Sequence, residues 1–272
     1  MKAWKASLAV AVLGSWMGSV PVWAHEVWVN TDHTHGGETL KAELAYGHFP
    51  AAMTISAERQ DIFKKPLQLI GPQGKQNLLQ KGLHNYSYQS AKPLPEGSYL
   101  VLAEYAPTFW SKNAQGWRRA NLQQMPDATY CEETRMFGKN VLNVGHDSAD
   151  TKIITQPTGQ ALEIVPLDNP ANVQVGKSLP VQVLYQGEPL ANATVVATFD
   201  GFTQRDADEH NHDLEPQAFS ATTDGQGKVG VIPLRQGFWK VRVVHKAAYG
   251  DAKICQFSAN YATLTFQIGH VH

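Results

Sequence analysis

Histidine is the residue type in this chain whose placement most clearly suggests chemistry. Six of the 11 histidines form His-x-His pairs, at His33 and His35, His210 and His212, and His270 and His272. His25 instead follows Val22-Trp23-Ala24, a small-x-small pattern typical of signal-peptide cleavage sites. Cleavage after Ala24 would leave His25 with a free α-amine beside its imidazole. These two nitrogens on one residue form a chelate that suits nickel, cobalt or copper.

Residues 1–24 have the organisation of a signal peptide. Lys2 and Lys5 precede an apolar stretch from Leu8 to Val20. A membrane anchor is the alternative, but spanning a bilayer takes about 20 continuous apolar residues, and glycines and serines interrupt this run. We therefore expect export to the periplasm, with no membrane-spanning segment left after cleavage. The mature chain would hold 21 basic and 24 acidic residues, which disfavours nucleic acid or anionic membrane as a partner.

His48 is the best candidate for a second ligand beside His25. It ends a predicted strand in the motif Tyr46-Gly47-His48-Phe49-Pro50, where glycine permits close approach of the backbone. Antiparallel pairing with the first predicted strand would place the start of one strand beside the end of the other, about 5 Å apart. Together with the amine, the two imidazoles would form a histidine brace. The alternative is a histidine whose hydrogen bonds are satisfied at a strand end.

The other histidine pairs are weaker candidates. His33 and His35 share one face of an extended chain and are expected to join the principal metal site, or else to lie in a solvated loop. The acidic stretch Asp206–Asp213 includes Asp208, His210 and His212, which predicts a secondary, low-affinity metal-collecting loop or a solvated connection between strands. His270 and His272 lie near the end of the sequence, where chance exposure explains them equally well.

Alternating apolar residues between Gly, Pro and Asn turns predict an all-β protein. The length favours two β-sandwich domains, a metal-binding one over residues 25–155 and an immunoglobulin-like one over residues 156–272. Strands are expected in the first half at His25–Asn30, Glu38–His48, Leu67–Ile70, His84–Gln89, Ser98–Tyr105 and Asn140–Val144. Those expected in the second half are Ala161–Val165, Ser178–Tyr185, Thr194–Phe199, Ala218–Thr223, Lys228–Pro233, Phe238–His245 and Ala262–Ile268.

Cys131 and Cys255 are the two cysteines of the chain. In an exported protein they are expected to form a disulfide that links the first half to the second. Thiolate metal ligands are the alternative, although the Cys-x-x-Cys spacing is absent. Phe109, Trp110 and Trp117 are expected in a loop, either as a wall beside the metal or as packing residues.

Seven segments occur in a characteristic order along the chain: Ala24–Val29, Tyr46–Pro50, Leu94–Tyr99, Ala106–Trp110, Gly138–Gly145, Gly187–Leu190 and Thr223–Gly227. Together they resemble the NikM-like family of periplasmic proteins of unknown function associated with nickel and cobalt transport. The resemblance implies a periplasmic, β-rich protein that handles a transition metal, with His25 and His48 as ligands. It assigns no role to His33, His35 or the Asp206–Asp213 stretch.

These observations favour a binding protein that captures nickel, cobalt or copper and supplies it to components of a membrane metal importer. A copper oxidoreductase built on a histidine brace is the second interpretation. A structural or adhesive module with incidental histidines is the third. No nucleophile elbow, phosphate-binding glycine loop or His-Glu-x-x-His helix occurs, so no catalytic residue is assigned.

Overall fold

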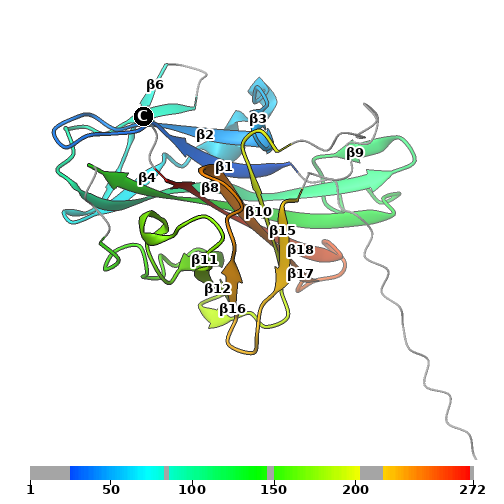
Figure 1. The fold of residues 1–272 in the computed structure, drawn as a ribbon. Coiled ribbons are helices and arrows are strands. Elements are labelled where there is room, and N and C mark those ends of the chain that lie inside the picture. Colours follow the sequence, from blue (N-terminus) through cyan, green and yellow to red (C-terminus); the bar gives the residue numbers. More distant parts are fainter. Residues whose placement is uncertain (1–24, 83–85, 146–149, 203–216, 270–272) are drawn as a thin grey trace, which may run out of the picture.

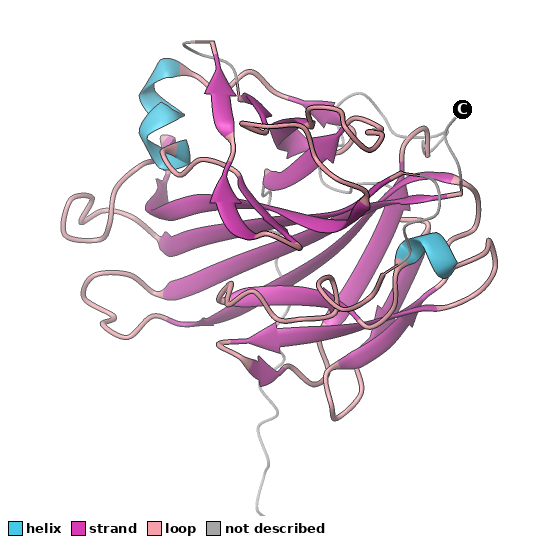
Figure 2. Cartoon of the chain, turned by 90° about the vertical axis from the view of Figure 1, so that its left-hand side faces the viewer, coloured by secondary structure: helices cyan, strands magenta, loops and turns pink. Residues whose placement is uncertain are grey.

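The computed structural model describes residues 25–82, 86–145, 150–202 and 217–269. Within these ranges the chain is all-β, apart from the short 3₁₀ helices η1 (Ala57–Phe63) and η2 (Pro170–Asn172) (Figure 2). No helix in the described ranges has the length and apolarity needed to cross a bilayer. The predicted signal peptide, residues 1–24, lies outside the described residues.

The strands form a long central sheet between two smaller outer sheets (Figure 1). The first outer sheet contains β1 (Glu26–Thr31), β2 (Lys41–His48), β3 (Ala51–Ala52), β6 (Leu79–Lys81) and β7 (Ser87–Gln89). The second contains β11 (Leu162–Pro166), β12 (Leu179–Tyr185), β13 (Glu188–Pro189) and β16 (Lys228–Val231).

The central sheet has nine strands, and eight of them follow the order β15-β14-β17-β18-β10-β8-β4-β5, with β9 paired to β8. Their bounds are β4 (Gln68–Gly71), β5 (Gly74–Asn77), β8 (Gly97–Asn113), β9 (Gly116–Arg118), β10 (Tyr130–Val144), β14 (Thr194–Phe199), β15 (Phe219–Thr222), β17 (Gly237–Ala248) and β18 (Phe257–Ile268).

The middle of the central sheet is buried on both faces, because each outer sheet covers one of them. Along β8, Val101 and Ala103 pack into the core beneath the first outer sheet, whereas Leu100 and Leu102 pack into the core beneath the second. Successive side chains of a strand point to opposite faces, so one strand serves two hydrophobic cores. The second half of the chain forms an immunoglobulin-like sandwich in this way, with Trp239 fully buried in its core.

The two halves of the chain meet in the central sheet. Strand β10 of the first half pairs in parallel with β18, the last strand of the second half. A disulfide between Cys131 and Cys255, 124 residues apart, joins the ends of these strands with Cα atoms 5.2 Å apart. The predicted disulfide is therefore confirmed, and the alternative of thiolate metal ligands is wrong. The division into domains at residues 25–155 and 156–272 stays a prediction.

Strand β1 lies directly against the central sheet. The hydroxyls of Thr263 and Thr265 on β18 donate to the carbonyls of Val27 and Val29, at 2.7 and 2.6 Å. Gly138 on β10 faces the same strand, and a Cβ there would lie 3.4 Å from the Trp28 Cα. These contacts fix the position of β1, and with it the position of His25 at its start.

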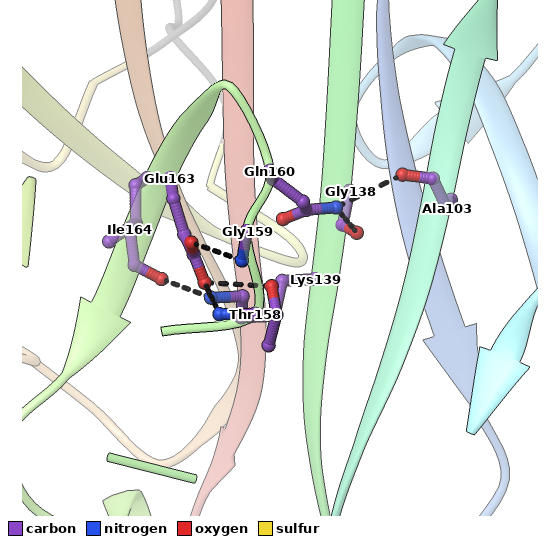
Figure 3. Close-up of polar contacts among 8 residues, drawn as sticks. All are labelled: Ala103, Gly138, Lys139, Thr158, Gly159, Gln160, Glu163 and Ile164. Carbon is purple, nitrogen blue, oxygen red and sulfur yellow. Dashed lines mark hydrogen bonds and ion pairs between the residues drawn. The ribbon is translucent and has the colours of Figure 1, made fainter. Parts of the chain in front are cut away.

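A buried ion pair connects the central sheet to the second outer sheet. The Lys139 ammonium on β10 contacts the Glu163 carboxylate on β11 at 2.5 Å and donates to the Ile164 carbonyl at 3.0 Å (Figure 3). Nearby, the Gln160 amide donates to the carbonyls of Ala103 and Gly138 (Figure 3). Burial lowers the pKa of Lys139 below its usual value, and the charge of Glu163 opposes that shift.

The predicted strands correspond to observed ones, with two instructive differences in the first half. Strands β8 and β10 extend well beyond the predicted Ser98–Tyr105 and Asn140–Val144. The loop expected around the aromatic residues is therefore wrong, since Phe109 and Trp110 lie within β8 and Trp117 within β9. His84 and Asn85 of the predicted strand His84–Gln89 lie outside the described residues, Tyr86 precedes the observed strand, and β7 covers Ser87–Gln89.

Candidate metal centre

The pairing of β1 with β2 brings His25 and His48 together. The two strands are antiparallel, with Glu26 opposite Gly47, so that His25 lies at the next position of the register, beside His48. The imidazole ring centroids are 4.9 Å apart. The sequence-based expectation of antiparallel pairing between these strands is confirmed. Two imidazoles at this separation are close enough to contact one ion.

Gly47 shapes the turn that carries His48. Its φ of +135° lies in a region that favours glycine. A Cβ at this position would lie 2.8 Å from the Met53 Cγ and 3.2 Å from the Ala51 carbonyl oxygen. The Met53 amide donates to the Tyr46 carbonyl at 2.7 Å and folds the following residues back across β2. The close backbone approach predicted for this glycine is confirmed.

Aromatic rings form one wall of the cavity next to the histidine pair. The Tyr46 ring lies 5.2 Å from the His25 ring and stacks at 6.2 Å with Tyr105 of β8. The Trp110 indole donates to the Tyr105 hydroxyl at 2.8 Å. Burial raises the pKa of Tyr105 to about 12, so this phenol is neutral at physiological pH. The wall is therefore aromatic and uncharged.

A β-bulge explains why Tyr105 and Trp110 face the same cavity although they are five positions apart. Thr134 of β10 is opposite Thr108, but Met136 is opposite Tyr105, so β8 advances three residues where β10 advances two. The extra residue, in the Ala106-Pro107 segment, reverses the alternation of the following side chains. Proline is tolerated there because a bulge releases its backbone from the hydrogen-bonded ladder.

The environment of His25 favours a neutral imidazole. Burial lowers the pKa of His25 to about 4, and His48 and then the positive charge of Arg59 add to the shift. A neutral imidazole has a free lone pair with which it can ligate a metal. The neutral form of His25 therefore predominates throughout the physiological pH range.

Two positively charged side chains line the same cavity, which has a volume of about 460 Å³. Arg59, on η1, lies over the Trp110 ring with its Cζ 5.0 Å from the ring centroid, and it also interacts with the Tyr46 hydroxyl. Lys112, on β8, lies 5.8 Å from the centroid of Trp117. Both contacts are cation–π interactions.

Glu132 is a buried carboxylate that lines the cavity from β10. It accepts hydrogen bonds from the hydroxyls of Tyr130 at 2.5 Å and Thr134 at 3.0 Å, and its Oε2 lies 3.4 Å from the Lys246 ammonium. Both carboxylate oxygens thus have partners within the protein. Glu132 acts in this structure as a structural acceptor at the edge of the cavity.

The predicted grouping of four principal ligands is corrected by the structure. His33 and His35 have ring centroids 4.6 Å apart, but they are exposed and follow the other end of β1. The six residues of β1 span about 20 Å at 3.3 Å per residue, so this pair cannot share an ion with His25 and His48. In the described ranges, no three His, Cys, Asp or Glu side chains gather closely enough to hold a metal by themselves.

The other predicted ligands, Asp208, His210 and His212, lie outside the described residues, as do His270 and His272. Reasoning from sequence missed Arg59 and Glu132 as cavity residues. Arg59 lies on a 3₁₀ helix, and Glu132 lies in a part of β10 that was not predicted as strand. Neither residue belongs to a recognisable motif.

Comparisons with known proteins place the chain in a family but give no function. No match is found among proteins of curated function. Among solved structures, the chain is similar to a two-domain fibronectin type III segment of chicken tenascin, with 10% identity, coverage of 89% of this chain and 97% of that one, and a TM-score of 0.22. It is also similar to the D00-D0 domain of intimin, with 15% identity, coverage of 90% and 100%, and a TM-score of 0.20. The family described as a domain of unknown function, DUF4198, matches residues 22–247, and the chain belongs to that family.

Proposed function

We propose that this protein binds a divalent transition metal, nickel, cobalt or copper, through His25 and His48. The observation that carries the proposal is the pair of imidazole rings, 4.9 Å apart at the edge of an aromatic cavity. Imidazole nitrogen is a preferred ligand of all three metals. Nitrogen sites bind copper more tightly than nickel or cobalt, so the metal that is bound in the cell also depends on which metal is available.

The N-terminal amine would supply a third nitrogen. We propose that a signal peptide is removed after Ala24 on export to the periplasm, which frees the α-amine of His25. The amine and imidazole of His25 would then coordinate the ion together, and His48 would contribute the third donor. The metal would be cargo, passed on to components of a membrane importer. The resemblance of the sequence to NikM-like proteins supports this role.

Paired histidine variants test the ligand assignment by calorimetric titration of the mature protein with Ni(II), Co(II) and Cu(II). We expect His48→Ala to weaken binding at least tenfold, because it removes one of about three ligands. His35→Ala is the matched control, since His35 is also an exposed member of a close histidine pair but follows the far end of β1. Unchanged affinity in His48→Ala, or a larger loss in His35→Ala, would refute the assignment.

Native mass spectrometry of the exported protein tests the proposed N-terminus and reports bound metal in the same spectrum. We expect a chain that begins at His25. A variant with one extra residue before His25 should bind the metal more weakly, because its amine becomes an amide. Equal metal affinity in that variant and the parent would show that the α-amine of His25 is not a ligand.

The competing interpretations predict different results. A copper oxidoreductase would consume oxygen with ascorbate when loaded with Cu(II), whereas a cargo-binding protein would not turn over. A structural or adhesive module would bind none of the three metals at micromolar concentration.

A further inference from the structure

The cavity beside the histidine pair is much larger than a metal ion requires. Its volume is about 460 Å³, whereas one water molecule occupies about 30 Å³ in the liquid. Pockets for small organic molecules range from about 300 to 1,000 Å³. The space next to His25 and His48 therefore has the size of a site for a small organic molecule.

Among the described residues, the cations that line this cavity have no carboxylate partner. In the part of the chain that the structure describes, neither Arg59 nor Lys112 forms an ion pair with a carboxylate. Arg119, close to the same 3₁₀ helix, differs in this respect, since it contacts both oxygens of Asp61 at 2.8 and 2.7 Å. Glu132 lies near Lys246 instead. The cavity thus has positive charge available for an anion.

Arg59 is also positioned beside the candidate metal ligands. Its guanidinium interacts with the Tyr46 hydroxyl, and the Tyr46 ring lies 5.2 Å from the His25 ring. A bare divalent cation on the two histidines would face this positive charge, and like charges at short range repel. An anionic group between the metal and Arg59 would be attracted to both positive charges and would offset their mutual repulsion.

We propose that the metal is bound as a complex with a small chelator that carries a carboxylate, such as an amino acid or a polycarboxylic acid. This inference rests on the proposed function, because it uses the same histidines as metal ligands. The chelator would complete the coordination of the metal, and its carboxylate would pair with Arg59 through two parallel N–H donors. Its organic part would lie against the rings of Trp110 and Trp117.

A matched pair of chelators isolates the carboxylate. Histidine and histamine both offer an amine and an imidazole to Ni(II), but only histidine has a carboxylate. The mature protein is titrated with Ni(II) alone, with the nickel–histidine complex and with the nickel–histamine complex, and native mass spectrometry reports whether the chelator stays bound. We expect the histidine complex to bind about tenfold or more tightly than the histamine complex, as one charge-assisted pair predicts.

Arg59→Gln should remove this preference. The same variant should bind bare Ni(II) more tightly than the parent, because a like charge beside the metal is gone. An unfolded variant would lose both the preference for the histidine complex and the affinity for bare Ni(II). A lost preference together with tighter binding of bare Ni(II) therefore distinguishes the proposal from misfolding. Arg118→Gln is the matched control, since Arg118 is an exposed arginine of β9 that does not line the cavity; it should retain the preference.

The outcomes separate this inference from the function on which it rests. If the parent binds Ni(II) but releases the chelator, or binds both complexes equally well, the chelator proposal is overturned and metal binding stands. If neither bare nickel nor either complex binds, the proposed function fails, and the inference fails with it. Retention of the preference in Arg59→Gln would overturn the role of Arg59.

Discussion

Breaking the buried pair between Lys139 and Glu163 should reveal that its two members contribute unequally to stability. The side chains are 1% and 2% exposed. The Glu163 carboxylate accepts from the Lys139 ammonium at 2.5 Å, from the Thr158 amide at 2.6 Å, from the Thr158 hydroxyl at 2.7 Å and from the Gly159 amide at 3.1 Å. The ammonium has two acceptors, Glu163 and the Ile164 carbonyl. The carboxylate is therefore better solvated by the protein than the ammonium.

This asymmetry sets the expected magnitudes. Glu163→Gln leaves a buried ammonium without its counter-charge and places an amide opposite the Gly159 N–H, which should cost about 3–5 kcal/mol of unfolding free energy. Lys139→Met removes one of four hydrogen-bond donors to the carboxylate and should cost about 1–3 kcal/mol. The double variant should lose less than the sum, because it no longer contains an unpaired charge.

The pH dependence of the Glu163→Gln variant gives a second measurement. Burial already lowers the pKa of Lys139 below the ordinary value of 10.5, and Glu163 opposes this shift. Without Glu163 the pKa of Lys139 falls further. Between the folded and unfolded pKa values the unfolded state binds more protons, so stability rises with pH. The variant should therefore recover part of its loss as the pH rises from neutral toward 10.

Urea unfolding followed by tryptophan fluorescence measures all four proteins of this double-mutant cycle. Equal losses in the two single variants, or a larger loss in Lys139→Met, would contradict the hydrogen-bond argument. A double variant whose loss equals the sum would show that the two side chains do not interact.

Two further predictions concern the disulfide and the turn at His48. Replacing Cys131 and Cys255 by alanine should lower the unfolding free energy by up to about 4–5 kcal/mol in the chain-entropy model, seen as a lower urea midpoint, and thiol titration of the unreduced, denatured parent should find no free thiol. Gly47→Ala should cost about 1–3 kcal/mol because of its positive φ and the contact with Met53, and it should weaken metal binding by displacing His48. Gly225→Ala, whose added Cβ would meet no atom within 4 Å, should leave both measurements nearly unchanged.

The short strands of the second half were predictable because their chemistry is local. Thr194–Phe199 is rich in β-branched residues and lies between turns, and the observed strand has the same bounds as the predicted one. The pairing of β1 with β2 was also predictable, because the start of one strand and the end of the next meet in an antiparallel pair. This pairing alone was sufficient to predict that His25 and His48 lie close together.

The long strands of the central sheet were harder to predict for a physical reason. They are buried on both faces, so the period-two alternation that identifies a half-exposed strand is weak. In β8 the bulge at Ala106-Pro107 also reverses the alternation, and proline ordinarily argues against a strand. The prediction therefore ended at Tyr105 and placed Trp110 in a loop. Arg59 could not be found at all, because its position depends on how η1 packs against β8.

The two histidine pairs of the first half show what decides between candidate sites. His33 and His35 have closer rings than His25 and His48, at 4.6 against 4.9 Å, so proximity alone would rank them first. Both members of that pair are exposed, whereas only His48 is exposed in the other pair, and ordering exposed side chains around an ion costs conformational entropy. His25 is half-buried, is kept neutral and lies against Tyr46, so less entropy is lost on binding. Spacing in the sequence identifies both pairs, but only the surrounding sheets make one of them the better ligand.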